Sequence, residues 1–226
     1  MKEQIKPGFF GEHVCADDSR RFVDVKNEQF LYLGKKADWV FYGDSITAMW
    51  DVPLFFGNDN GIVVKRGICG DNTKYANLRY EADVLQLEPK NVILLIGVND
   101  IQTIWPDLWW KVDGADHEVV LNGLKQNMEE MIKKSEGIKL YVCSILPTLL
   151  CPPFDRKIMN DMIIRANVII KELCEKYKLT YIDYYTEMYD ESIGGLPEDM
   201  AYDGLHPNGK GYVKMAEILK RETGLR

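Results

Sequence analysis

One serine of this chain directly follows an apolar run that is typical of a buried strand. The run covers residues 40–42, Gly43 ends it, and Asp44 and Ser45 come next. In an open α/β sheet, residues at the carboxyl ends of the strands border the crevice where ligands bind. Ser45 is therefore either an ordinary helix N-cap or a nucleophile held on a tight turn, and this segment alone leaves both interpretations open.

One of the three histidines follows an aspartate at a spacing that suits acid–base chemistry. In Asp203-x-x-His206, the carboxylate can accept the Nδ1–H of the imidazole and leave Nε2 free to take a proton. A solvated loop histidine is the plainer interpretation of this pattern. His13 falls in an irregular N-terminal segment and His117 at the start of a helix. His206 is therefore the best placed candidate for a general base.

Two further predicted strands also end in glycine beside short polar residues. Residues 67–72 (Gly-Ile-Cys-Gly-Asp-Asn) follow the second strand and residues 97–100 (Gly-Val-Asn-Asp) follow the third. Such residues form turns after many strands, but three such ends would meet at one crevice. A serine nucleophile needs a base, and the oxyanion that it creates needs hydrogen-bond donors. The N–H groups of Ser45 and Gly70 and the side-chain amide of Asn99 are the available donors.

Together the four segments resemble the sequence blocks of the SGNH (GDSL-type) esterases and lipases. They occur in the order of that family and span most of the chain, at residues 43–46, 67–72, 97–100 and 203–207. The Gly-Asp-Ser-Ile-Thr and Gly-Val-Asn-Asp forms are most similar to enzymes resembling platelet-activating-factor acetylhydrolase and to bacterial carbohydrate esterases.

The resemblance implies a role for five positions of this chain. Ser45 would be the nucleophile, His206 the base and Asp203 the acid that orients it. The oxyanion hole would consist of Ser45, Gly70 and Asn99. The resemblance also implies a flavodoxin-like three-layer α/β/α sandwich and a reaction that needs neither a metal nor another cofactor.

The elements that must position these residues follow from periodicity. Strands that alternate with helices indicate a mostly parallel sheet with helices on both faces, and five strands fit the order 2-1-3-4-5. We expect one domain over residues 1–226, with a surface strap at 1–20 and an active-site flap at 101–116. The predicted strands end near residues 43, 67, 96, 145 and 184, and the predicted helices cover residues 19–34, a short segment after Ser45, 73–87, 120–132, 158–177 and 212–219.

Composition excludes several classes of protein. A formal net charge of −7 and a pI near 5.1 argue against a nucleic-acid binder. No apolar run approaches the ~20 residues that span a bilayer, and the N-terminus lacks the apolar core of a signal peptide, so we expect a cytoplasmic chain. Five scattered cysteines without a Cys-x-x-Cys pair predict neither disulfides nor a zinc site, and Cys69 is interpreted as a packing residue.

The sequence says less about the substrate. Asp44 and the tryptophans Trp50, Trp105, Trp109 and Trp110 are candidates to line the crevice, although tryptophans also cover sheet edges. With no long apolar groove in sight, we expect a small ester with a short acyl group, such as acetyl on a carbohydrate. The alternatives are a lysophospholipase or thioesterase, a non-catalytic carbohydrate- or lipid-binding module, and a nucleotide binder that uses residues 67–73 as an anion loop.

Overall fold

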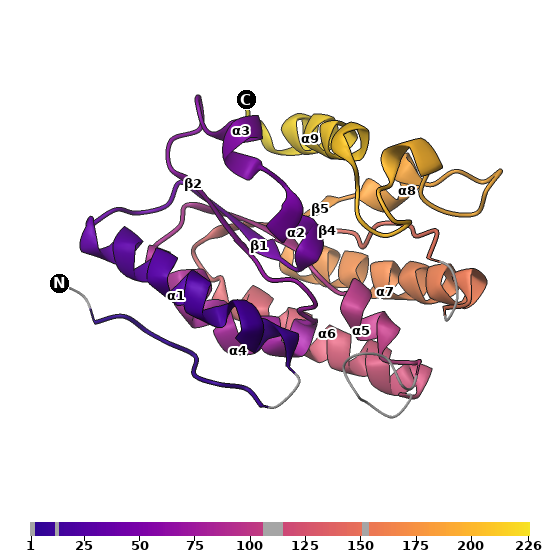
Figure 1. Ribbon diagram of the computed structural model, residues 1–226, viewed down its shortest axis with the longest axis horizontal. Coiled ribbons are helices and arrows are strands. Elements are labelled where there is room, and N and C mark those ends of the chain that lie inside the picture. The colour runs from indigo at the N-terminus through magenta and orange to yellow at the C-terminus, as the bar shows by residue number, and fades with distance from the viewer. Residues whose placement is uncertain (1–2, 12–13, 106–114, 151–153) are drawn as a thin grey trace.

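A parallel sheet forms the centre of the computed structural model, which describes residues 3–11, 14–105, 115–150 and 154–226 (Figure 1). Within these residues the strand order is β2-β1-β3-β4-β5 and every neighbouring pair is parallel. The predicted order and three-layer architecture are confirmed. The strands are β1 (Trp39–Gly43), β2 (Val63–Gly67), β3 (Asn91–Leu95), β4 (Lys139–Cys143) and β5 (Thr180–Ile182).

Helices cover both faces of the sheet, because alternate strand side chains point to opposite sides. Val40 and Tyr42 of β1 belong to one apolar core and Phe41 belongs to the other. This two-sided burial explains why the strands are apolar without interruption. The first core includes α4 (Thr73–Asp83), α6 (His117–Lys134) and α7 (Arg156–Tyr177), and the second includes residues of α2 (Ser45–Met49), α3 (Val52–Phe56), α8 (Tyr184–Met188) and α9 (Gly209–Thr223).

The N-terminal helix α1 (Cys15–Tyr32) lies against α4 on the outside of the first layer (Figure 1). The prediction of an irregular strap up to residue 20 is therefore wrong from Cys15 onwards, although residues 3–11 have no regular structure. Asp17 and Asp18 lie in the first turn of α1, where the helix dipole favours negative charge. Asp17 also accepts hydrogen bonds from the N–H of Phe10, which joins the irregular segment to the helix.

Three short helices complete the described part of the chain: α5 (Val98–Gln102) and the 3₁₀ helices η1 (Leu85–Leu87) and η2 (Glu198–Met200). The predicted fifth strand is shorter than expected, because Asp183 caps α8 and the chain turns helical at Tyr184. The predicted flap at 101–116 falls mostly on residues 106–114, outside the described residues.

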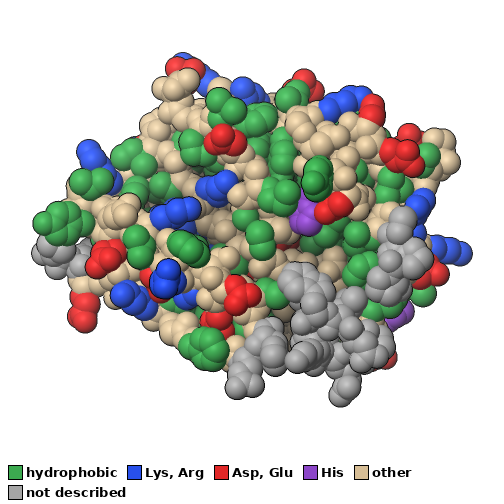
Figure 2. Space-filling model, viewed as in Figure 1, with side chains coloured by type: hydrophobic (Ala, Val, Ile, Leu, Met, Phe, Trp, Pro, Cys, Tyr) green, Lys and Arg blue, Asp and Glu red, His purple; other side chains and the backbone are tan. Residues whose placement is uncertain are grey.

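The outer surface carries charges of both signs. Lysine and arginine side chains are interspersed with acidic ones on the face that Figure 2 shows, in keeping with the 28 basic and 35 acidic residues of the sequence. Of the helices in the described residues, none combines the length and the apolar character that crossing a membrane requires.

Candidate active site

Ser45 is the first residue of α2 and directly follows the capping residue of that helix. The carboxylate of Asp44 accepts a hydrogen bond from the N–H of Ile46 at 2.9 Å, which is the bond of a helix N-cap. Gly43 ends β1 where a side chain would not fit, because a Cβ there would lie 2.0 Å from the carbonyl oxygen of Leu95. This close packing of β1 against β3 fixes Ser45 at the carboxyl end of the sheet.

His206 lies on a loop that leads into α9 and that Asp203 holds in shape. The Asp203 carboxylate accepts hydrogen bonds from the N–H groups of Leu205 at 3.0 Å and His206 at 2.8 Å. The loop is tied to the segment after β4 because the N–H of Leu149 donates to the carbonyl of Gly204 at 2.7 Å. The loop is therefore built by local bonds and docked at the same sheet edge as Ser45.

The structure brings Ser45, His206 and Asp203 into one hydrogen-bonded line. The Nε2 atom of His206 lies 2.8 Å from Ser45 Oγ, and its Nδ1 atom lies 2.7 Å from Asp203 Oδ2. Because an ionised carboxylate can only accept, Nδ1–H donates to Asp203 and Nε2 is left to accept the Ser45 hydroxyl proton. Burial alone would raise the pKa of Asp203, but hydrogen bonds from the backbone and ring of His206 outweigh it and lower the pKa.

Gly70 and Asn99 reach the same place from two other strand ends. Gly70 adopts a φ of 72°, a left-handed conformation that favours glycine, in the turn after β2. Asn99 lies in α5, which follows β3, and its Nδ2 donates to the carbonyl of Asp71 at 2.8 Å. An amide nitrogen carries two hydrogens, so this bond orients the side chain and leaves one donor for a ligand.

These residues line a cavity of about 170 Å³. Three of its lining residues, Cys69, Gln102 and Leu205, were not predicted, and a fourth, Met49, lies one helical turn after Ser45. Gln102 lies three residues after Asn99 in α5, and this helical spacing could have identified it. The interpretation of Cys69 as a packing residue is wrong, because its side chain is exposed at the cavity.

Two of the candidates for lining the crevice lie elsewhere. Trp50 is only 2% exposed and packs among aromatic rings, including Phe41, Phe56 and Tyr212. Asp44 is 1% exposed because its carboxylate caps α2. The prediction that these two line the cavity is wrong.

The remaining three candidates are the tryptophans of the predicted flap. Trp105 does not line the cavity at Ser45, so this prediction is also wrong; its ring meets that of Phe154 edge-on, with centroids 5.2 Å apart. Trp109 and Trp110 lie outside the described residues.

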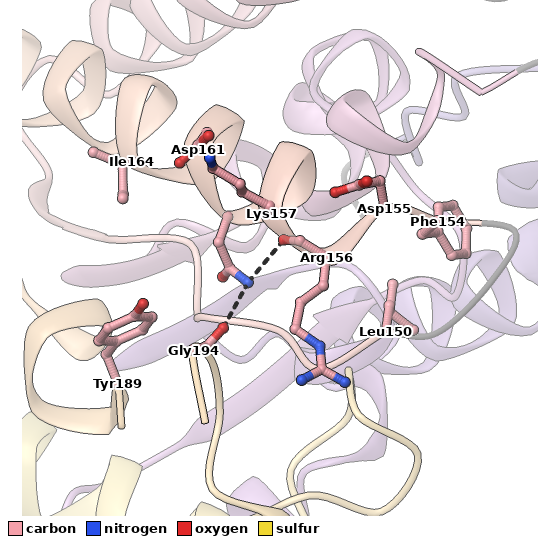
Figure 3. A pocket seen from close by; sticks show the side chains of 10 residues that line it. Leu150, Phe154, Asp155, Arg156, Lys157, Asp161, Ile164, Tyr189 and Gly194 are labelled. Atoms are coloured by element: carbon pink, nitrogen blue, oxygen red, sulfur yellow. Dashed lines mark hydrogen bonds between the residues drawn. The ribbon is translucent and has the colours of Figure 1, made fainter. Parts of the chain in front are cut away.

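A second cavity, of about 590 Å³, lies at the start of α7 (Figure 3). Charged side chains of Arg156, Lys157 and Asp161 line it, and the buried Asn160 donates to the carbonyl of Gly194 at 3.3 Å. Although it is larger, this cavity contains no described pair of a nucleophile and a base. The smaller cavity at Ser45 is therefore the candidate active site.

Potential metal ligands are scattered over the described residues. In the parts of the chain that the structure describes, no three histidine, cysteine, aspartate or glutamate side chains come together as a metal site would require. Four cysteines, Cys15, Cys69, Cys143 and Cys174, are free thiols.

Three buried carboxyl groups next to the cavity residues have raised pKa values. Burial raises the pKa of Asp44 and of Asp100 to about 7, and nearby carboxylates add to this effect. Burial likewise raises the pKa of Asp71 to about 6, and an ion pair with Arg79 opposes the rise. The protein therefore holds a cluster of carboxyl groups that change charge close to neutral pH.

These shifts predict a stability that falls as pH rises. Between about pH 4 and pH 7 the folded protein holds protons that the unfolded chain has released, so the free energy of unfolding decreases across this range. Asp44→Asn keeps an oxygen that can cap α2 and removes one of these groups. We expect the decrease to become shallower in this variant, by at most about 1.4 kcal/mol per pH unit. Urea unfolding of both proteins at several pH values tests this, and parallel curves would contradict it.

A serine hydrogen-bonded to a His–Asp pair at the carboxyl edge of a parallel α/β sheet is an arrangement found in serine hydrolases. The model of the GDSL-like lipase/acylhydrolase family matches residues 41–214. The chain therefore belongs to this family.

The chain is also similar to individual curated proteins and to solved structures. An N-acylneuraminate cytidylyltransferase of Escherichia coli is 30% identical over 86% of this chain, and an acetylxylan esterase of Xylanibacter ruminicola is 27% identical over 64% of it. The chain spans only 43% and 31% of the lengths of these two proteins. The crystal structure of a GDSL-like lipase from Bacteroides thetaiotaomicron superposes with a TM-score of 0.72 at 25% identity, covering 88% of this chain and 95% of the lipase.

Proposed function

We propose that this protein hydrolyses short-chain esters, above all acetyl esters, with Ser45 as the nucleophile. The observation that carries the proposal is the 2.8 Å contact between His206 Nε2 and Ser45 Oγ. In this mechanism His206 takes the serine proton as Oγ attacks the acyl carbon, and then gives the proton to the departing alcohol. Asp203 orients the imidazole and stabilises its charged form. Water then repeats the sequence on the acyl-enzyme.

The negative oxygen of each tetrahedral intermediate would lie between the N–H groups of Ser45 and Gly70 and the free N–H of Asn99. Donors that are fixed before the reaction stabilise this charge without reorganising. The hydrogen bond from Asn99 to the Asp71 carbonyl supports the proposal, because it holds one such donor in place at the cavity wall.

The size of the cavity supports a small acyl group. About 170 Å³ holds an acetyl or propionyl group beside the reacting atoms, while a palmitoyl chain would have to extend out of the cavity. The relative from Xylanibacter ruminicola is named an acetylxylan esterase, which favours an acetylated carbohydrate as the substrate. The name of the cytidylyltransferase is not carried over, because the residues that support the proposal, Ser45, His206 and Asp203, form the hydrogen-bonded arrangement of a serine hydrolase.

The acyl-chain preference of the purified protein tests this proposal. We expect kcat/KM to fall steadily from 4-nitrophenyl acetate to the butyrate, octanoate and palmitate, because each longer chain fills more of the cavity and the palmitoyl chain exceeds it. The Ser45→Ala variant, measured on the same esters, corrects for hydrolysis that does not use the site. A maximum at octanoate or palmitate would contradict the acetyl preference and favour a lysophospholipase or thioesterase of the same family.

Two observations weigh against the alternative functions. The segment after β2 is poorly suited to bind a phosphate, because the carboxylate of Asp100 already accepts hydrogen bonds from the N–H at 2.9 Å and the hydroxyl of Thr73. A non-catalytic binding module has no need of a serine hydrogen-bonded to a His–Asp pair. Serine-dependent turnover of any ester would exclude both alternatives.

A further inference from the structure

A buried arginine of α4 contacts the segments that surround the cavity. Arg79 is fully buried, and its guanidinium lies beneath the carboxyl ends of β1 and β2. Its Nη2 donates to the carbonyl of Gly43 at 2.9 Å, and its Nη1 donates to the carbonyl of Arg66 at 3.0 Å. The carbonyl of Gly43 belongs to the last residue of β1 and that of Arg66 to the residue before the last of β2, and both strands lead into the site.

The same guanidinium also bonds two carboxylates. Its Nε donates to Asp71 at 2.6 Å and its Nη1 donates to Asp83 at 2.8 Å. Burial by itself opposes the charge of Arg79, but the two carboxylates outweigh burial and raise the pKa of the guanidinium. Arg79 therefore stays charged, and its planar guanidinium group fixes all four acceptors relative to one another.

Three of the four contacts, those with Gly43, Arg66 and Asp71, lead to the segments that carry the proposed oxyanion donors. Gly43 lies two residues before Ser45, and Asp71 directly follows Gly70. The carbonyl of Asp71 in turn accepts the hydrogen bond from Asn99 Nδ2 at 2.8 Å. A single side chain thus joins the turn before Ser45, the turn that holds Gly70, and the residue that orients Asn99.

From this geometry we propose that Arg79 is a positioning residue, which sets the oxyanion donors of Ser45, Gly70 and Asn99 at their working spacing. Arg79 lines no cavity at Ser45 and acts only through the backbone turns. The inference rests on the proposed function, because it assigns Arg79 a part in stabilising the same oxyanion. The loss of Arg79 should then reduce the stabilisation of the transition state and leave the binding of the substrate in the ground state nearly unchanged.

Arg20 provides a matched control, because it belongs to the same buried network but reaches none of the three segments. It lies in α1, is 6% exposed, and donates to both oxygens of Asp83 at 2.6 and 2.7 Å. Arg20→Met and Arg79→Met each remove a buried charge from Asp83. A purely structural role predicts that both variants lose stability and that both retain kcat once the folded fraction is taken into account.

The experiment measures kcat and KM for 4-nitrophenyl acetate, and the affinity for a trifluoromethyl ketone, in both variants. The ketone forms a tetrahedral adduct on a serine and so reports on the oxyanion donors. For Arg79→Met we expect kcat to fall roughly 10²–10³-fold, as when one donor is lost, with KM within about threefold and a matching loss of ketone affinity. Arg20→Met should retain the wild-type values.

Arg79→Lys keeps the inference testable if Arg79→Met does not fold. Lysine retains the buried charge, but its ammonium cannot reach both carbonyls and both carboxylates as the planar guanidinium group does. We expect a folded enzyme with a lower kcat and an unchanged KM. Wild-type kcat in Arg79→Lys, or equal losses of kcat in the Arg79 and Arg20 variants, would overturn the inference. If wild type itself showed no Ser45-dependent turnover, the proposed function would fail first.

Discussion

Ser45→Ala is expected to lower kcat for 4-nitrophenyl acetate by about 10⁴-fold or more, since the variant lacks the hydroxyl that His206 contacts. The substitution removes the Oγ atom that contacts His206, while the hydrogen bond between His206 and Asp203 can remain. KM and the thermal unfolding temperature should change little, because the alanine still begins α2 and Asp44 still caps it.

Ser192→Ala is the matched control for this substitution. Ser192 is exposed and its hydroxyl donates to Asp190 at 2.6 Å, in a loop that does not line the cavity at Ser45. This variant should retain wild-type kcat. If Ser45→Ala kept more than about a hundredth of the wild-type kcat, Ser45 would not be the nucleophile.

His206→Ala should cause a loss of similar size, about 10⁴-fold in kcat. Without the imidazole, Ser45 has no base among the described residues that line the cavity, and the leaving alcohol has no proton donor. Residues that act as one unit show non-additive losses, so the double variant Ser45→Ala/His206→Ala should be no slower than either single variant.

His117→Ala provides the control for a lost imidazole, because His117 is exposed at the start of α6. This variant should be as active as wild type. Multiplied losses in the double variant of Ser45 and His206, or an unaffected His206→Ala enzyme, would contradict the assignment of His206 as the base of Ser45.

Much of the fold follows from local patterns in the sequence. The uninterrupted apolar run of β3 predicts a strand that is covered on both faces, and the structure places β3 between β1 and β4. Each parallel pair needs a crossover, and the amphipathic pattern of α7 supplies one of them. The order 2-1-3-4-5 itself came from the statistics of such folds and from the family resemblance, because neither alternation nor apolar character encodes which strands are neighbours.

The site was predicted for a different reason. Ser45 and His206 are 161 residues apart, so no periodicity relates them. Their proximity followed from the rule that the carboxyl ends of parallel strands meet at one edge, together with the resemblance of four segments to one family. The short spacing of Asp203 and His206 is local, and it was sufficient to predict that their side chains could pair.

The failed predictions concern side chains whose burial depends on tertiary packing. Tryptophan side chains often stack on ligands, yet the Trp50 ring packs in an aromatic cluster with Phe41 and Phe56. Free cysteines are usually buried in the core, yet Cys69 lies beside the left-handed turn at Gly70 and is exposed at the cavity. The role of Arg79 could not be inferred from the sequence either, because its four acceptors lie in segments that meet only in the folded protein.

The most direct test of the central claim is to identify the residue that becomes covalently modified by a fluorophosphonate. This reagent reacts with a serine whose hydroxyl is activated by a neighbouring base and leaves a stable adduct for peptide mapping by mass spectrometry. The geometry predicts one adduct per chain, on the peptide that contains Ser45. Esterase activity should decrease in proportion to the fraction of Ser45 that is labelled. An adduct on another residue, or full esterase activity after Ser45 has been labelled, would contradict the account.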